Sequence, residues 1–522
     1  MHGSVMSVPS GGWHRRGIWL ATALIGAALL VAGLLVGPFG GVGHAATHPV
    51  TVSLTFDDSN ADQLPAEQTM KAAGLHGTFY TVSGWVGQPG YLTLANLQQI
   101  QADGNEIAGH TIEHPDLPTL DPNEQMREIC NDRVNLINWG FQPTDFAYPF
   151  ADADTNETDA KACGYNSARG LGDVVSPGDC SGCVYAETMP PPDPYYLRAP
   201  DEVDATWTLA QMEQEVTNAQ SHKGGWVILT FHHICSDIGA ADCPSDLSTT
   251  PAIFNAFVTW LAGQASNGTT VKTVQQVIGG TFKPGTYVNP PAPAAAGVNA
   301  LPNPSLETIN SATGFPQCWQ AGGWGTNTVA WANTTAAHTG TNAENLTVTN
   351  YSSGDAKLLN TLDLGACTPT VVPGDTYNLS VWYESTGTTQ FALYYRTTNG
   401  SWFYWTSSPW FATASTWTQA TFTTPPVPAG ANGMSFGLAL IANGSLTTDD
   451  YSLVLPTTAA KASAAAPAGI KVLGAVSPVT LGAKFHVHSH AKPLIPGAGK
   501  VKPHTRFAIP EATPGPNAKS ST

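Results

Sequence analysis

The sequence predicts two unlike folds in one chain, an α/β barrel followed by an all-β sandwich. Short apolar strands alternate with helical stretches over residues 47–288, and polar residues follow the strands, as in a parallel barrel whose site lies at the strand ends. A Pro/Ala run over residues 289–298 cannot bury a core and predicts a linker. Residues 299–456 are rich in Thr, Asn, Ser and Trp in short alternating segments, which indicates a β-sandwich.

Hydrophobic periodicity locates the elements of the barrel. The strongest strand candidate is the alternating run at 51–56, which ends on two adjacent carboxylates. Further strands are expected at 77–82, 145–150 and 226–231. Helices are expected at 94–103, 123–139, 205–220, 254–265 and 273–278.

The two ends of the chain carry no predicted domain. Within residues 1–46, Arg15 and Arg16 precede an apolar run and a small-residue sequence that ends at Ala46. This pattern favours a cleaved export signal and a secreted protein, or a membrane or cell-surface anchor if it is not cleaved. Residues 457–522 are rich in Ala, Pro, Lys and Gly without periodicity, and we expect them to be disordered.

Composition excludes one class of partner and indicates the redox compartment. The net charge of −17 and the absence of a basic stripe argue against nucleic-acid binding. Eight cysteines in an exported chain favour disulfides, and Cys180-x-x-Cys183 has no second such pair that would make a zinc site. The sequence does not indicate the oligomeric state. The pairs expected from spacing are Cys130–Cys163, Cys180–Cys183, Cys235–Cys243 and Cys318–Cys367.

Two short motifs in the barrel predict a metal site. Asp57 and Asp58 end the first strand, where successive side chains point to opposite faces, so the two carboxylates must do different things. His110 and His114 are four residues apart, a spacing that puts both on one helix face or in one tight turn. Either motif alone is also typical of a turn, a helix cap or solvated histidines. Together, two imidazoles and a carboxylate leave a coordination position open, the pattern of catalytic zinc.

Thr55-Phe56-Asp57-Asp58 followed by His110-Thr111-x-x-His114 resembles the first two motifs of the polysaccharide deacetylases, the NodB-homology or family-four carbohydrate esterases. The resemblance covers about 47–288. It implies a distorted, incomplete (β/α) barrel of the NodB type, with Asp58, His110 and His114 as ligands of a divalent metal. Zinc is expected, with cobalt or nickel as alternatives. Asp57 would be the base that takes a proton from the attacking water.

The resemblance also implies how the leaving group and the oxyanion are handled. By position in the third motif, the main-chain N–H of Phe150 would meet the oxyanion. His232, at the end of an apolar strand, would protonate the leaving group. His233 is the alternative acid, because strand alternation lets only one of these two histidines face the site.

One position departs from the family pattern. The third motif commonly begins with an arginine that orients the base, but this chain has Ala147 there. Arg169 is the candidate substitute and Arg198 is a second. The alternative is that both arginines form ordinary surface salt bridges.

The second domain resembles the jelly-roll carbohydrate-binding modules. The resemblance rests on Asn303-Pro304-Ser305-Leu306-Glu307, on Cys318-Trp319 and on the segment 449–453. It implies a structural calcium site at Glu307 with Asp450, or with Asp449 in its place. Jelly rolls bury many aromatics in their cores, so only some would face a sugar. The sugar-binding candidates are Trp324, Trp402, Trp405 and Trp410.

Together the resemblances imply a secreted hydrolase that acts on carbon–nitrogen bonds other than peptide bonds. Its partner would be an N-acetylglucosamine polymer such as chitin, peptidoglycan or an exopolysaccharide, with acetyl-xylan as the O-ester variant. A sugar-binding module would hold the enzyme on the polymer. The missing arginine motivates an alternative, a carbohydrate-binding protein whose barrel has impaired catalysis. An amidase for a small acyl compound is a third possibility, but it would leave the second domain without a purpose.

Overall fold

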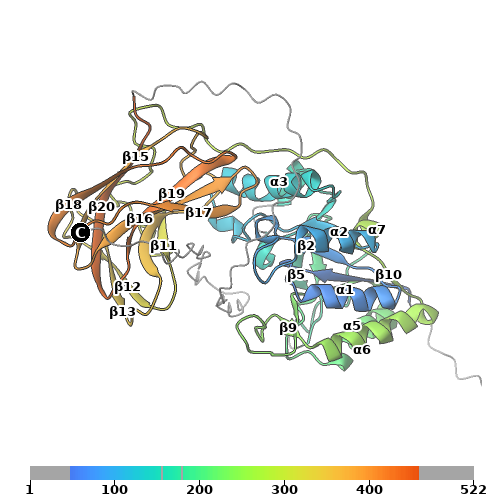
Figure 1. Cartoon of the computed structure of the whole chain (residues 1–522). Coiled ribbons are helices and arrows are strands. Elements are labelled where there is room, and N and C mark those ends of the chain that lie inside the picture. The colour runs from blue at the N-terminus through green and yellow to red at the C-terminus, as the bar shows by residue number, and fades with distance from the viewer. Residues whose placement is uncertain (1–47, 154–156, 178–179, 458–522) are drawn as a thin grey trace, which may run out of the picture. The chain divides into compact units, whose positions relative to one another are not determined.

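The structure of the chain, a computed structural model, describes residues 48–153, 157–177 and 180–457 (Figure 1). The predicted export segment and the predicted C-terminal tail lie outside these residues. Among the described helices, none has the length and apolar character needed to cross a membrane. The predicted fold class is confirmed, because a parallel sheet with helices precedes antiparallel β-sheets.

The first fold is an incomplete barrel of parallel strands. Its sheet has the order β10-β1-β2-β3-β4-β5-β6, and β7 pairs with β1. No pairing joins β6 to β7 among the described strands, so the barrel is open between them. The strands are β1 Val50–Phe56, β2 Thr78–Thr81, β3 Glu106–Gly109, β4 Asp145–Ala147, β5 Ser167–Asp173, β6 Leu197–Ala199, β7 Gly225–Phe231 and β10 Thr269–Val271.

Helices surround these strands (Figure 1). Those predicted from periodicity are present with boundaries shifted by a few residues, while α1 and α4 were not predicted. The expected strand at 145–150 ends early, because a 3₁₀ turn, η3, follows it at Pro149–Ala151. The helices are α1 Gln63–Ala72, α2 Leu94–Ala102, α3 Pro122–Asn138, α4 Glu157–Ala162, α5 Leu209–His222, α6 Pro251–Ala262 and α7 Val274–Ile278. The shorter 3₁₀ turns are η1 Ser83–Trp85, η2 Leu117–Thr119 and η4 Gly263–Asn267.

The alternation of β1 decides which of its side chains reach the barrel interior. Its apolar set, Val50, Val52, Leu54 and Phe56, packs in the cluster that includes α1, α5 and α6. Ser53, on the opposite face, accepts a hydrogen bond from Trp226 Nε1 at 2.9 Å. Because successive side chains alternate, Asp57 continues the inward set at the carboxyl end of the strand.

An arginine of α3 ties down the chain that follows α7. Arg133 is fully buried, and its guanidinium donates to Lys283 O at 2.7 Å and to Pro284 O at 3.1 Å. It also donates to Pro143 O and Cys163 O. Asn131 exchanges two hydrogen bonds with the main chain of Val288. The last residues of the predicted first domain are therefore attached to the barrel through one helix.

Glu215 on α5 makes the stability of the barrel depend on pH. Its side chain is buried, Oε2 has no hydrogen-bond partner among the described residues, and burial raises its pKa to about 8. Between pH about 4.5 and 8 the folded state keeps a proton that the unfolded chain has lost, so stability falls as pH rises through this range. Glu215→Gln should stabilise the protein at pH 8 by on the order of 1–3 kcal/mol and change little at pH 4.5.

Thermal unfolding of the wild type and the variant at both pH values measures this effect. Glu213→Gln, on the same helix but only half-buried, is the matched control and should show no comparable pH-dependent gain. An equal gain for Glu215→Gln at both pH values would contradict the assignment to a buried proton.

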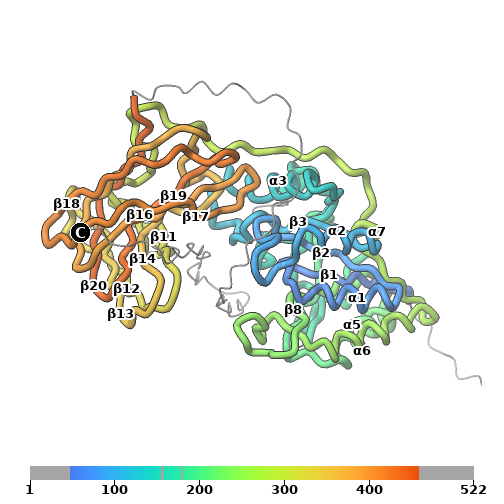
Figure 2. The backbone as a smooth tube through the Cα atoms, viewed as in Figure 1, coloured from blue at the N-terminus to red at the C-terminus, as the bar shows by residue number. Residues whose placement is uncertain are grey.

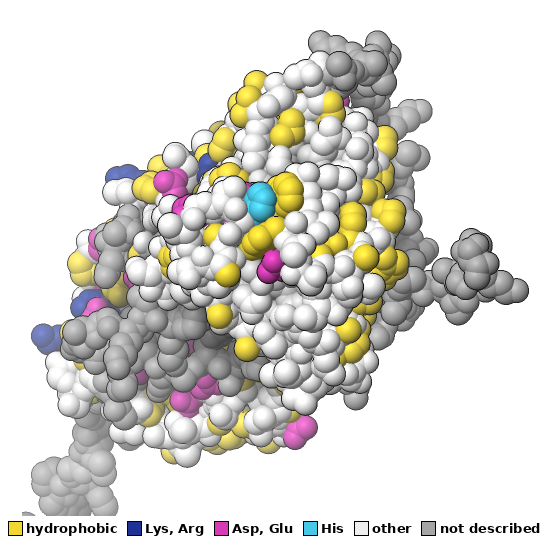
Figure 3. Space-filling model, turned by 90° about the vertical axis from the view of Figure 1, so that its left-hand side faces the viewer, with side chains coloured by type: hydrophobic (Ala, Val, Ile, Leu, Met, Phe, Trp, Pro, Cys, Tyr) yellow, Lys and Arg dark blue, Asp and Glu magenta, His cyan; other side chains and the backbone are white. Residues whose placement is uncertain are grey.

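The second fold is a sandwich of two five-stranded antiparallel sheets, whose path Figure 2 traces. One sheet has the order β11-β14-β19-β16-β17 and the other β12-β13-β20-β15-β18. Apolar side chains from both sheets form the main hydrophobic core of the sandwich. The strands are β11 Trp319–Trp324, β12 Thr328–Thr334, β13 Ala343–Thr349, β14 Asp355–Asn360, β15 Asn378–Ser385, β16 Thr389–Thr397, β17 Trp402–Ser407, β18 Ala414–Thr423, β19 Ala431–Leu440 and β20 Gly444–Val454. On the face shown in Figure 3, charged side chains are sparse among uncharged polar and apolar ones.

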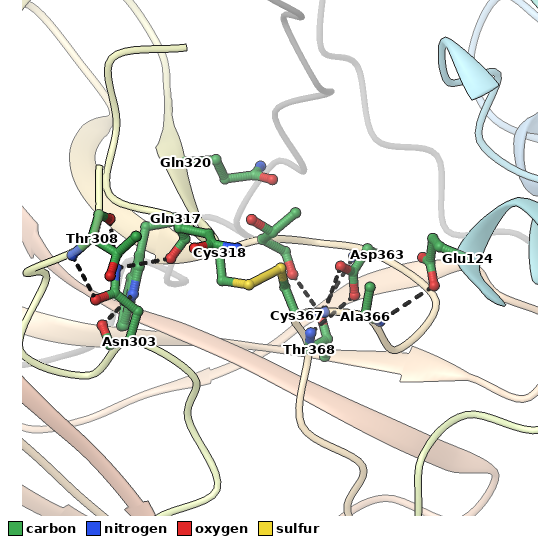
Figure 4. The surroundings of a disulfide bond; sticks show 12 residues. Glu124, Asn303, Thr308, Gln317, Cys318, Gln320, Asp363, Ala366, Cys367 and Thr368 are labelled. Atoms are coloured by element: carbon green, nitrogen blue, oxygen red, sulfur yellow. Dashed lines mark hydrogen bonds between the residues drawn. A yellow bond between two sulfur atoms is a disulfide. The ribbon is translucent and has the colours of Figure 1, made fainter. Parts of the chain in front are cut away.

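All four predicted disulfides are present. Figure 4 shows the bond between Cys318 and Cys367 in the sandwich, where Asp363 accepts from the main-chain N–H groups of Cys367 and Thr368. The bond between Cys235 and Cys243 closes a loop beside the short strands β8 (His233–Ile234) and β9 (Ser248–Thr249).

Candidate active site

Asp58, His110 and His114 come together at the carboxyl ends of β1 and β3. Asp58 Oδ1 lies 3.6 Å from His110 Nε2 and 3.4 Å from His114 Nε2. A tetrahedral ion with bonds of about 2.0–2.2 Å separates its ligand atoms by about 3.3–3.6 Å. His110 Nε2 is also buried without a hydrogen-bond partner among the described residues. The two distances from Asp58 Oδ1 match such an ion, and the three candidate ligand atoms all lie within 4.8 Å of one another, so the side chains present fit a divalent metal.

The two histidines lie in a turn, which decides between the helix face and the tight turn that the spacing allowed. Thr111 and His114 both have positive φ values, 69° and 56°. His110 Nδ1 is 2.7 Å from Ala147 O, which only accepts, so this nitrogen donates and Nε2 is the atom that a metal could bind. Thr111 Oγ1 accepts from His114 N at 2.9 Å.

Two buried acids of helix α3 accept hydrogen bonds from the main chain of this turn and of a neighbouring segment. Asp132 accepts from the main-chain N–H groups of His110 and Ser83, and Glu128 accepts from those of Ile112 and Glu113. Burial raises the pKa of Asp132 well above its usual range. The sequence shows these acids only as polar positions of an amphipathic helix, so their support of the site was not predicted.

The electrostatics of the three candidate ligands suit a cation. Burial alone would raise the pKa of Asp58, but His114, His110 and His232 beside it hold that pKa well below its usual range. Burial lowers the pKa of His114 to about 4. At neutral pH, Asp58 is therefore ionised and His114 is neutral, the forms in which a carboxylate and an imidazole bind metal.

Asp57 lies beside the three candidate ligands, with its Oδ2 3.9 Å from His110 Nε2. Arg169 Nη2 donates to Asp57 Oδ2, and both side chains are almost fully buried. Arg169 on β5 is the register partner of Ala147 on β4, and paired residues on neighbouring strands share a face about 5 Å apart. An arginine is therefore present beside the expected position 147, on the neighbouring strand β5.

The second candidate arginine lies elsewhere. Arg198 on β6 forms a bidentate pair with Glu187, with a shortest distance of 2.7 Å, and its side chain is partly exposed. Among the described residues no hydrogen bond or ion pair joins it to Asp57; it instead holds Glu187, whose main chain forms an isolated bridge with Trp226. Arg198 is therefore a structural ion pair rather than a partner of the base.

His232 and His233 diverge, as strand alternation requires. His232 Nε2 lies 3.9 Å from Asp57 Oδ2, on the side of the barrel where Asp58 and the imidazoles gather. His233 Nδ1 instead pairs with Asp62 at 2.8 Å. Asp62 and His233 also lie near Cys235, but Cys235 is in a disulfide and offers no thiolate for a metal.

Phe150 borders the metal-ligand turn. It has a φ of 58° within η3, its ring lies 4.7 Å from that of His114, and 43% of its surface is exposed. Trp85 approaches His114 from another segment, with ring centroids 5.4 Å apart, and packs against Tyr91. The role of the Phe150 N–H toward an oxyanion stays a prediction.

The two acids of the expected calcium site bind one loop of the sandwich. Glu307 accepts from the main-chain N–H groups of Thr341 and Asn342, and Asp450 accepts from Thr339 Oγ1, Ser305 Oγ and His338 Nδ1. Asp449 accepts from the N–H groups of His338 and Thr339. The acids therefore act on neighbouring parts of the loop 338–342, and calcium binding stays a prediction.

The four sugar-binding candidates differ in exposure. Trp410 is 53% exposed and Trp324 is half-buried. Trp402 packs with Leu359 and Tyr394 in a small cluster, and Trp405 packs against the sandwich core. Trp410 therefore offers the most accessible ring of the four, and their contact with sugar stays a prediction.

The comparisons with known proteins support the recognition of the first domain. Residues 44–168 match the model of the family described as Polysaccharide deacetylase, so the chain carries a polysaccharide deacetylase domain. YxkH of Bacillus subtilis (strain 168), assigned to the polysaccharide deacetylases by name, is 29% identical over 135 residues. These residues are 25% of this chain and 46% of that protein, so the match spans about half the length of this curated relative.

Two solved structures are similar to portions of the chain. A family 4 carbohydrate esterase from Streptomyces lividans in complex with acetate is 17% identical, with a TM-score of 0.29, over 43% of this chain and 93% of that chain. The CBM22-1 xylan-binding domain of Xyn10C from Paenibacillus barcinonensis is 15% identical, with a TM-score of 0.22. That likeness covers 29% of this chain and 90% of the domain.

Proposed function

We propose that the chain is a secreted, metal-dependent deacetylase that removes acetyl groups from a polysaccharide, N-acetyl groups in particular. The observation that carries the proposal is the convergence of Asp58, His110 and His114 with Asp57 and His232 beside them. These five residues follow the ends of the strands β1, β3 and β7, and contacts of 3.4–3.9 Å link their side chains. The substrates we favour are chitin, peptidoglycan and poly-N-acetylglucosamine, with acetyl-xylan as the ester alternative.

The residues divide the chemistry of amide hydrolysis among them. Asp57, held by Arg169, accepts a proton from the water that attacks the acetyl carbon, and a new carbon–oxygen bond forms. His232 gives a proton to the nitrogen as the carbon–nitrogen bond breaks. The Phe150 N–H stabilises the oxyanion. A zinc ion, or cobalt or nickel, on Asp58, His110 and His114 would supply Lewis acidity toward the acyl oxygen and the water.

The contact between Arg169 and Asp57 favours an active barrel over the alternative of a catalytically impaired binding protein. That alternative depended on the alanine at position 147. Arg169, on the strand next to position 147, donates a hydrogen bond to Asp57. It therefore takes the role of the expected arginine. The sandwich would hold the enzyme on its polymer, and four disulfides suit an extracellular location.

Acetate release by the full-length protein tests the proposal. Chitooligosaccharides, peptidoglycan and acetyl-xylan would be incubated with the protein, with and without a chelator. We expect release from at least one N-acetylglucosamine polymer, lost with the chelator and restored by zinc. Binding to a polymer without acetate release from any substrate would instead establish the carbohydrate-binding alternative.

A further inference from the structure

A buried glutamine joins the two strand ends that carry Asp57 and His232. Strands β1 and β7 pair in parallel up to Phe56 and Phe231, and Asp57 N donates to Phe231 O at 2.9 Å. Beyond this point the carbonyls of Asp57 and His232 both accept from the side-chain amide of Gln63, at 2.5 and 2.9 Å. Gln63 thus continues the connection between the strands where their own ladder ends.

The chemistry of these contacts fixes the orientation of the glutamine. Both partners of its terminal atom are carbonyl oxygens, which only accept, so the atom must be the NH₂ nitrogen rather than the oxygen. Gln63 is fully buried at the first position of α1. Without its donors, the buried carbonyl of Asp57 would lose its hydrogen bond from Gln63, and the carbonyl of His232 would keep only the longer one from Asn60. Leaving a buried carbonyl without a partner costs more than the bond itself contributes in water.

Two neighbours of Gln63 hold the same dipeptide. Asn60 Nδ2 donates to His232 O at 3.2 Å, and Asp62 pairs with His233 Nδ1. The segment 60–63 therefore contacts His232 through its carbonyl and His233 through its ring. The imidazole of His232 is left to face Asp57.

We propose that Gln63, assisted by Asn60, is a positioning residue that sets where His232 stands as proton donor relative to Asp57. The inference rests on the proposed function. Gln63 and Asn60 touch only main-chain atoms at the site, the carbonyl of His232 and, for Gln63, also that of Asp57. They therefore act through the main chain and touch no reacting atom. A displacement of about 1 Å in a catalytic group can lower a rate by about 100-fold, so small changes at position 63 should be visible.

The leaving group distinguishes positioning of the acid from a general structural role. The amine of an N-acetylglucosamine unit must be protonated to leave, whereas the phenolate of 4-nitrophenyl acetate leaves without a proton. Gln63→Met keeps the length of the side chain but has no donor. We expect it to lower kcat on chitooligosaccharides by about 10- to 100-fold with KM unchanged, and to lower the ester rate by less than about 3-fold.

Two further variants secure the comparison. Gln220→Met removes another buried glutamine amide, one that donates to Thr269 Oγ1 at 2.8 Å far from the site, and it should leave both rates unchanged. Asn60→Ala removes only the weaker contact with His232 O and should show the same selectivity to a smaller degree. It also serves if Gln63→Met does not fold.

The outcomes separate this inference from the proposed function. Equal loss on both substrates, or no loss on either, would overturn the role of Gln63. In a crystal structure of Gln63→Met, we expect His232 Nε2 to move away from Asp57 Oδ2, from the present 3.9 Å. An unmoved His232 would overturn the inference whatever the activity, whereas a wild-type protein that releases no acetate from any polymer would overturn the proposed function.

Discussion

Asp57→Asn should lower acetate release by about 100- to 10,000-fold while the protein keeps its affinity for metal. The amide cannot accept the proton of the attacking water, and loss of a general base costs about 100- to 10,000-fold. The three candidate metal ligands are unchanged, although Asp57 Oδ2 lies 3.9 Å from His110 Nε2. The measurements are acetate release from chitooligosaccharides and zinc binding by isothermal titration calorimetry.

A matched change at the surface controls for charge. Asp103→Asn removes a carboxylate that pairs with the exposed Lys71 at 2.7 Å, and both properties should stay at wild-type values. If Asp57→Asn kept more than a tenth of the activity, Asp57 would not be the base. If it lost zinc along with activity, Asp57 would belong to the metal site.

Arg169→Met should lower both the activity and the stability of the protein. It leaves the Asp57 carboxylate buried without its cation, and breaking one side of a buried ion pair costs about 3–5 kcal/mol. We also expect kcat to fall by about 100-fold, because the base is no longer held in one orientation. Thermal unfolding and acetate release test both effects. Arg198→Met also leaves a buried carboxylate, that of Glu187, without its cation but does not touch Asp57, so as the control it should lower stability and leave the activity unchanged.

The register between β4 and β5 allows a stricter test of the same contact. In the double variant Ala147→Arg with Arg169→Ala, the guanidinium moves to the paired position on the neighbouring strand. We expect this variant to recover part of the activity that Arg169→Ala alone loses. Recovery would show that the barrel needs one arginine at either of the two positions, whereas wild-type activity in Arg169→Met would contradict any role for it.

The parts of the site that could be predicted are those that local patterns determine. Alternation along residues 51–56 separates Asp57 from Asp58, and the same rule separates His232 from His233. The spacing of His110 and His114 indicated a pair but left helix and turn open, and the positive φ values that make it a turn depend on contacts with α3.

The parts that could not be predicted depend on register and on hidden polar burial. The sequence favoured Arg169 over Arg198 but could not exclude that both form surface salt bridges, and only the pairing of β5 with β4 brings Arg169 to Ala147. Helix α1 was missed because half of its four buried residues are polar, Gln63 and Glu67, so its apolar period is too short to detect. Because Gln63 is the first residue of this unpredicted helix, its contacts with Asp57 and His232 were not predicted either.

The attachment of residues 283–288 to α3 constrains how the chain can be shortened and how it is made. A fragment that stops after α7 would keep every strand of the barrel but would leave Arg133 buried without two of its four carbonyl partners. During synthesis, Arg133 cannot form these two hydrogen bonds until residues 283 and 284 have left the ribosome. The last contacts of the barrel are therefore made by residues 283–288, which belong to neither a strand nor a helix. An expression fragment of the catalytic domain should end beyond Val288.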